Sequence, residues 1–218
     1  MPFLMTHLII AKNLSKIFPQ NICLPQLYLG SIAPDAVHFR PNYVSDYKKA
    51  SHLIVGPERW GLITNNDEWE NDIIAFLDKN IGTENHDFIL GYCTHILSDL
   101  YNNVNIWTPF RLKYPDEIEK GYGNLNHQEH NKIDIELALT YEGREDFWSN
   151  LIKSTSLDLP GIIYAVEIDK QKNNILDIQY KDKERPDIAS NQLVTYESTM
   201  DFINKATNFV AQILRKHL

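Results

Sequence analysis

The chain has 218 residues, of which 43% are hydrophobic and 23% charged, so it can bury one sizeable core as a single domain over residues 1–218. Its net charge of −8 argues against general nucleic-acid binding, because a protein that neutralises the phosphate backbone carries an excess of Lys and Arg. Its two cysteines lie far apart and match no disulfide framework or thiolate zinc motif. No apolar run is long enough for a transmembrane segment and no basic leader is visible, so a cytoplasmic location is expected.

The first predicted element is an amphipathic helix over residues 6–18. Its apolar positions, 8, 9, 10, 14, 17 and 18, recur at helical spacing. Thr6 is the expected N-cap, which places His7 in the first turn. Pro19 is expected to end the helix.

A second short helix is predicted over residues 24–30, closed by Gly30. Pro34 disfavours helix at the residue before it, so Asp35 is expected at a turn or at a helix start. A carboxylate on such a rigid loop is well placed to act as a ligand. Further along, His52 stands in another short polar motif and is a second candidate ligand.

Two helices are predicted in the middle of the chain. Residues 67–80 show amphipathic spacing and follow a polar cap at residues 65–66. Residues 84–101 form the most apolar helical run, which places them at the centre of the fold. Residues 102–123 contain two prolines and two glycines and are expected to form a long loop, a kind of connection that is often functional.

The last third of the chain predicts helices over residues 125–141, 144–154 and 193–217. Residues 160–181 are ambiguous, because their alternating apolar positions fit one small β-hairpin while a helix fits equally well. The predicted fold class is therefore all-α: a single-domain multi-helix bundle in which only a hairpin near 160–181 remains open.

Two predicted helices each carry a histidine and an aspartate four residues apart: His95 with Asp99, and His130 with Asp134. On a helix, that spacing puts both side chains on one face. A buried acid and imidazole are costly unless they pair with each other or hold a metal ion. The presence of two pairs, with further His and Asp residues in short motifs, favours the metal. Nitrogen and carboxylate ligands without thiolates suit zinc, and also iron or manganese.

Five short motifs occur in a fixed order along the chain. They are Thr6-His7-Leu8, Gly30-Ser31-Ile32-Ala33-Pro34-Asp35, Ser51-His52-Leu53, Thr94-His95-Ile96-Leu97-Ser98-Asp99 and His130-Asn131-Lys132-Ile133-Asp134. In order and residue type, over about residues 5–140, these motifs resemble the zinc-dependent phospholipase C family and the related S1/P1-type nucleases. The resemblance implies a helical bundle of the phospholipase C/P1 nuclease type, with Asp134 standing where the family has Glu.

The resemblance also implies a set of metal ligands. Those of one close cluster are His7, Asp35, His52, His95 and Asp99. In that cluster the Asp99 carboxylate bridges two zinc ions, while His130 and Asp134 belong to a further ion. The family places a third-ion histidine six residues after Asp99, where this chain has Asn105, and His127 is the candidate replacement. One to three zinc ions are therefore expected, with other divalent transition metals as alternatives.

The function implied by the resemblance is metal-dependent hydrolysis of a phosphoester bond. Zinc lowers the pKa of a bound water from about 15.7 to about 7, and the resulting hydroxide attacks phosphorus. Asp35 is the candidate catalytic residue, either as a ligand or as acceptor of the water proton. The expected substrate is a small-molecule phosphoester or a phospholipid head group. The alternative is a catalytically inactive, metal-stabilised helical binding protein; a helical phosphohydrolase of the His-Asp type ranks third.

Overall fold

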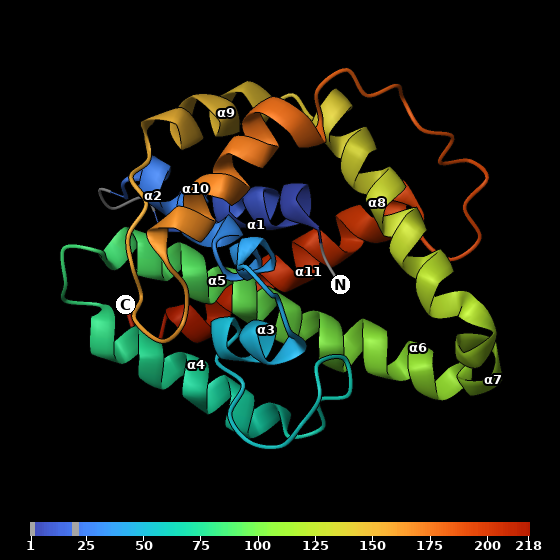
Figure 1. Cartoon of the computed structure of the whole chain (residues 1–218), viewed down its shortest axis with the longest axis horizontal. Helices are drawn as coiled ribbons and strands as arrows, with labels where there is room; N and C mark the ends of the chain where they lie inside the picture. Colours follow the sequence, from blue (N-terminus) through green and yellow to red (C-terminus); the bar gives the residue numbers. More distant parts are fainter. Residues whose placement is uncertain (1–2, 19–21) are drawn as a thin grey trace.

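Helix α5 (His86–Asn102) runs through the middle of the computed structural model, which describes residues 3–18 and 22–218 (Figure 1). Every residue from Phe88 to Leu100 is buried, because neighbouring helices cover this helix on all of its faces. The helices that pack directly against it are α1 (Leu4–Ile17), α2 (Leu24–Ile32), α4 (Asn66–Asn80) and α11 (Tyr196–Leu214).

The remaining helices and several tight turns complete the fold. The helices are α3 (Ser45–Ser51), α6 (Thr108–Lys113), α7 (Pro115–Glu117), α8 (Gly123–Thr140), α9 (Arg144–Lys153) and α10 (Ala165–Asn174). A 3-10 turn spans Pro34–Phe39, and π-helical turns span Asn103–Trp107, Ile118–Tyr122 and Ile175–Gln179. Within the described residues the extended structure is an isolated bridge between Leu159 and Ile163, so the all-α prediction is confirmed. None of the helices in these ranges is both long and apolar enough to cross a membrane.

Helices α2 and α5 cross so closely that their backbones touch. A Cβ atom on Gly30 would lie 2.0 Å from the carbonyl oxygen of Phe88, and one on Gly91 would lie 2.0 Å from that of Leu27. Only glycine fits at both positions, because any side chain would overlap the opposite backbone. Helix α2 accordingly continues past Gly30, which does not close it as predicted. This reciprocal contact fixes where the C-terminal end of α2 meets α5.

The observed helix starts show which local signals operate. Helix α1 begins at Leu4, so Thr6 lies buried inside the helix and is not its N-cap. Its predicted end at Pro19 falls outside the described residues. Helix α4 is capped as predicted, since the Asn65 side chain accepts a hydrogen bond from the Glu68 N–H. Capping by a side chain thus determined the start of α4, whereas packing against the core determined that of α1.

The prediction of a loop over residues 102–123 is wrong, because this stretch is almost entirely helical. Pro109 and Pro115 stand in the first turns of α6 and α7, where the missing N–H removes no hydrogen bond. Gly121 adopts φ 107° and introduces a kink without ending the helical segment. The prolines and glycines therefore divide the segment into short helices that form one edge of the molecule (Figure 1).

The hairpin considered for residues 160–181 is also wrong, and the helical alternative is correct. Residues 165–174 form α10, and the Glu167 carboxylate accepts the N–H of Tyr164 at the start of that helix. The buried positions are 163, 167, 168, 171 and 175, which is helical spacing. Two of these positions hold polar residues, Glu167 and Gln171, so the apolar pattern alone gave a misleading period of two.

Candidate metal centre

Four segments far apart in the sequence bring five side chains together beside the middle of α5. His7 lies on α1, Asp35 on the 3-10 turn, His52 at the end of α3, and His95 and Asp99 on α5. Asp99 is central: its Oδ1 lies 3.7 Å from His7 Nε2. Its Oδ2 lies 3.4 Å from His52 Nε2 and 3.7 Å from His95 Nε2. Asp35 closes the group, with Oδ1 3.6 Å from His52 Nε2 and Oδ2 4.0 Å from His95 Nε2. We call these residues the five-residue cluster.

Four inward-facing atoms of the five-residue cluster lack hydrogen-bond partners. The Nε2 atoms of His7, His52 and His95, and Oδ1 of Asp99, are all buried and unpaired. Leaving one buried polar atom unpaired costs about 1–3 kcal/mol, so four such atoms around one point are unusual in a folded protein. A cation between them would satisfy all four.

The spacing of these atoms fits first-row divalent ions. Ligands 2.0–2.2 Å from a tetrahedral zinc ion lie ~3.4 Å from one another, close to the observed separations. Two triads, His7–Asp35–His95 and His52–His95–Asp99, have ligand atoms within 4.8 Å of each other. His95 belongs to both triads but offers one free nitrogen, so it can ligate one ion, while the two oxygens of Asp99 face different histidines. The donor set therefore suits one or two ions.

The tautomers of His52 and His95 leave the inward nitrogen free to bind a metal. His95 Nδ1 lies 2.8 Å from the Ser31 carbonyl oxygen, and His52 Nδ1 lies 2.9 Å from that of Lys48. A carbonyl oxygen only accepts, so each Nδ1 carries the proton and each Nε2 presents its lone pair. The contact with Ser31 depends on the close crossing of α2 and α5.

His7 is oriented in the same way by a hydroxyl group. Ser98 Oγ donates to the carbonyl oxygen of His95 at 2.7 Å, which uses its only proton. The same oxygen lies 3.0 Å from His7 Nδ1 and must therefore accept the proton of that nitrogen. All three imidazoles thus turn an unprotonated Nε2 toward the two carboxylates, as metal-ligating histidines do.

The end of α3 is anchored from two other helices, which positions His52. The Ser51 carbonyl oxygen accepts a hydrogen bond from the Tyr92 hydroxyl on α5. The His52 carbonyl oxygen accepts one from Trp69 Nε1 on α4, at 2.7 Å. The next residue, Leu53, adopts φ 57°, a left-handed conformation that side-chain-bearing residues rarely take. Strain of this kind beside a candidate ligand is common at functional sites.

Burial keeps the ligand histidines neutral. It lowers the pKa of His7, together with the neighbouring His95, well below the usual value, and lowers that of His52 to about 3. Burial also raises the pKa of Asp99 to about 6. It opposes ionisation of Asp35 as well, but the nearby ammonium of Lys48 holds the pKa of that carboxyl well below its usual range. At neutral pH the cluster therefore presents neutral imidazoles and carboxylates.

Lys48 is a member of the site that the sequence did not reveal. Its side chain is only 5% exposed, and its Nζ donates to Asp35 Oδ1 at 2.7 Å. The same ammonium lies 3.4 Å from His38 Nε2 and 4.6 Å from the centre of the Trp60 ring. The sequence held one indication of its role: Lys48 stands four residues before His52 in a helical segment, and this spacing places both side chains on one face.

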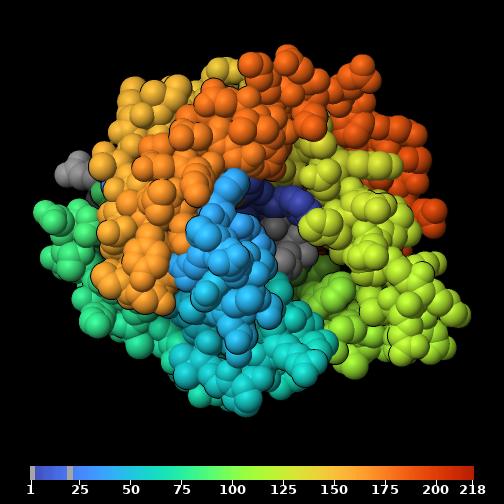
Figure 2. Space-filling view, in the orientation of Figure 1, coloured from blue at the N-terminus to red at the C-terminus, as the bar shows by residue number. Residues whose placement is uncertain are grey.

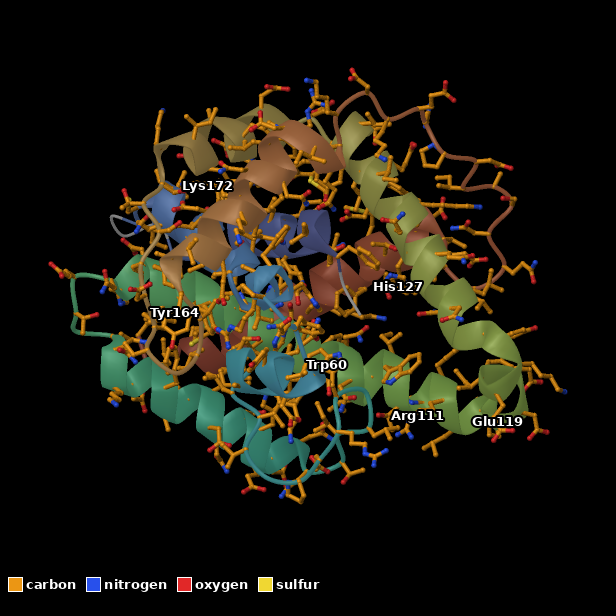
Figure 3. The ribbon with its side chains drawn as sticks, in the orientation of Figure 1. Trp60, Arg111, Glu119, His127, Tyr164 and Lys172 are labelled. Carbon is orange, nitrogen blue, oxygen red and sulfur yellow. The ribbon has the colours of Figure 1, made fainter. Side chains whose placement is uncertain are left out.

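Two cavities reach the cluster from the molecular surface and share Trp60 and His127 in their walls. The Asp35 cavity, about 340 Å³, is lined by residues that include Asp35, His38, Tyr43, Lys48, Trp60 and His127. The Asp99 cavity, about 200 Å³, is lined by residues that include Trp60, Ile63, Trp69, Asp99, Trp107 and His127. Figure 2 shows a hollow between the blue segment around α3 and the yellow-green segment around the start of α8, and Figure 3 labels Trp60 and His127 near it.

The remaining predicted ligands, His127, His130 and Asp134, do not join the cluster. Asp134 Oδ1 accepts the Met5 N–H at 2.9 Å, and Oδ2 accepts the Tyr180 hydroxyl at 2.5 Å. Its carboxylate thus supports the first turn of α1. His130 lines a cavity of about 250 Å³ that shares Asn102, Trp107 and Asn126 with the Asp99 cavity. Its Nδ1 donates to the Asn126 carbonyl oxygen at 2.8 Å. The exposed His127 lies at the rim of both cluster cavities.

The chain also contains the adjacent His-Asp pair that a phosphohydrolase of the His-Asp type requires, His86–Asp87. The pair lies at the start of α5, where Asp87 Oδ2 accepts the N–H of Cys23 at 3.0 Å. His86 lines a different cavity, with Ile17, Phe18 and Arg215 among its walls. Because the pair stands apart from the five-residue cluster, the arrangement gives no support to that alternative.

Comparison with protein-family models, with curated proteins and with solved structures finds no match for this chain. The resemblance to zinc-dependent phospholipases C therefore stays a prediction, and the function must be argued from the cluster itself.

Proposed function

We propose that this protein is a divalent-metal-dependent hydrolase of phosphoester bonds, with a helical fold of the phospholipase C type. The observation that carries the proposal is the ring of buried, unpaired Nε2 atoms of His7, His52 and His95 around Asp99. Each histidine is fixed by a hydrogen bond from its other nitrogen. Preorganisation of this kind is a property of metal ligands.

The residues divide between two ions. His52, His95 and Asp99 Oδ2 would hold the first, with Asp35 beside it. His7 and Asp99 Oδ1 would hold the second, so that Asp99 serves both. When bound, zinc lowers the pKa of its water to about 7 and makes hydroxide available at neutral pH.

The chain's own residues bind and orient the substrate in this proposal. Asp35 keeps one oxygen on Lys48 and turns the other toward His95, so it can ligate an ion or accept the proton released by the attacking water. The cavity walls bring aromatic rings, including those of Trp60 and Trp107, close to the cluster. The cavities, of about 200 and 340 Å³, suit a small-molecule phosphoester or a phospholipid head group.

A second candidate function is a metal-stabilised binding protein without turnover. It is favoured by the position of the cluster, which ties α1, α3, α5 and the 3-10 turn together at a buried point. An ion there would connect four segments and contribute to folding as structural zinc does.

Elemental analysis and a chelator experiment separate these candidates. We expect purified protein to contain about two zinc equivalents and to hydrolyse a generic phosphodiester or a choline phospholipid; a chelator should stop turnover and added zinc should restore it. Loss of thermal stability on chelation, with no turnover at any stage, would favour the binding protein. Less than about one metal equivalent would contradict both.

A further inference from the structure

We propose that Lys48 is a phosphoryl contact and that its ammonium supplies the positive charge of a third ion, so that the site binds at most two metal ions. The inference rests on the proposed function for the identity of the phosphoryl group. The observation behind it is the position of the Lys48 ammonium. This buried group on α3 donates a hydrogen bond to Asp35 and lines the cavity beside the five-residue cluster.

Lys48 has donor capacity beyond its ion pair with Asp35. An ammonium group offers three protons. One is donated to Asp35 Oδ1 at 2.7 Å, and His38 Nε2 lies near a second at 3.4 Å. A third proton remains for a ligand. The flat face of Trp60, 4.6 Å away, limits where the ammonium can move and helps to hold it over the cavity.

Among the described residues that line the Asp35 and Asp99 cavities, Lys48 is the sole lysine and no arginine occurs. The protein as a whole carries a net charge of −8, so a cation in this position is contrary to its general composition. A buried ammonium beside a cavity forms short, charge-assisted hydrogen bonds with phosphate oxygens.

Asp134, one of the residues predicted for a further ion, is otherwise engaged. Both carboxylate oxygens of Asp134 accept hydrogen bonds, from Met5 N–H and from the Tyr180 hydroxyl. Asn105, which stands where the family has a histidine, is exposed and donates to the Tyr101 carbonyl oxygen. An ion held by Asp134 would have to displace the Met5 contact that joins α1 to α8, whereas Lys48 already places a positive charge at the cavity wall.

In the reaction, the Lys48 ammonium would contact a non-bridging phosphoryl oxygen, where negative charge accumulates as hydroxide attacks. A contact of this type stabilises the transition state without transferring a proton. Because Asp35 remains paired through Oδ1, its Oδ2 stays directed at the metal side of the cluster. Lys48 therefore acts on the substrate and at the same time orients one ligand.

Inorganic phosphate binding, measured by calorimetry on metal-free and zinc-loaded protein, tests this inference alongside metal content. The variants are Lys48→Met, Lys48→Arg and the matched control Lys49→Met. Lys49 is the next residue on α3, but its Nζ donates to the Gly56 carbonyl oxygen and it lines neither cluster cavity. We expect Lys48→Met to weaken phosphate binding roughly 10-fold to 100-fold, the loss of one charged hydrogen bond, with unchanged metal content. Lys48→Arg should recover most of the affinity, and Lys49→Met should bind as the unmodified protein does.

Phosphate affinity that is unchanged in Lys48→Met would overturn the inference, as would a third zinc equivalent in the unmodified protein. Loss of metal in Lys48→Met, together with unchanged phosphate affinity of the metal-free protein, would also contradict it, because Lys48 would then act only through Asp35. If Lys48→Met does not fold, by circular dichroism, Lys48→Gln takes its place, since glutamine removes the charge and keeps a hydrogen-bond donor for Asp35. Failure of the proposed function would give a different result. If the protein binds no metal but still binds phosphate through Lys48, the proposed hydrolase is wrong and the contact between Lys48 and phosphate is supported.

Discussion

The two His-x-x-x-Asp pairs of this protein have the same spacing on two helices and entirely different surroundings. On α5, His95 and Asp99 point into the five-residue cluster, where His95 Nε2 and Asp99 Oδ1 have no hydrogen-bond partner. On α8, both oxygens of Asp134 accept hydrogen bonds, while His130 lines another cavity. Helical spacing puts two side chains on one face, but the elements packed against that face decide whether they share a ligand.

Replacing the aspartate of each pair by asparagine should give the largest difference in metal content and activity between the two pairs. We expect Asp99→Asn to lose more than one metal equivalent and more than ~100-fold in activity, beyond the effect typical of outer-shell residues. Asp134→Asn should keep its metal and lose about 1–3 kcal/mol of stability, because a buried network is disturbed. Elemental analysis and urea unfolding of both variants measure the two effects. Retention of all metal by Asp99→Asn, or its loss from Asp134→Asn, would contradict the assigned roles.

The α5 pair depends on the backbone contact between α2 and α5, which the α8 pair lacks. Gly91→Ala would place a methyl group 2.0 Å from the Leu27 carbonyl oxygen and force the helices apart. We expect the free energy of unfolding to fall by about 3 kcal/mol, which is at the upper end for an overpacked core. We also expect weaker metal binding, because Ser31 would move away from His95. Gly82→Ala is the matched control, since nothing lies within 4 Å of a Cβ there. Equal stability of the two variants would show that the crossing can relax.

Acidification should have the smallest effect on stability, and it acts on buried groups of both the α5 pair and the α8 pair. Burial lowers the pKa of His52 and of His130 to about 3, so their stabilisation is complete above pH 6.5 and is lost as the pH falls toward 3. Burial raises the pKa of Asp99 and Asp134 to about 6, so these carboxyls offset part of that loss below pH 6. We expect metal-free protein to be less stable at pH 5.5 than at pH 7.5, by on the order of 1 kcal/mol, in urea unfolding.

Bound zinc should sharpen that pH dependence, because protons compete with the metal for the cluster histidines. Replacement of His130 by Asn should reduce the pH dependence of the metal-free protein without changing its zinc content. Stability that is equal or greater at pH 5.5 would contradict the prediction, because the carboxyls would then outweigh the histidines or the histidines would be protonated in the folded state.

Local signals predicted some parts of the fold well and others poorly. The apolar run of α5 identified the central helix, and the polar cap at Asn65 identified the start of α4. The loop predicted for 102–123 is wrong because proline also fits a first helical turn. The choice between hairpin and helix for 160–181 stayed open because Glu167 and Gln171 occupy buried positions. Neither feature can be recognised before the neighbours of these residues are known.

The sequence by itself determined that the protein is helical and that His7, Asp35, His52, His95 and Asp99 are candidate ligands, because residue type and short-range spacing carry that information. Only the tertiary structure decided that these five side chains meet, that Lys48 joins them and that His130 and Asp134 do not. The reason is physical. Which buried polar atoms find partners depends on segments tens of residues away, and here the contact of Gly30 and Gly91 sets how those segments approach.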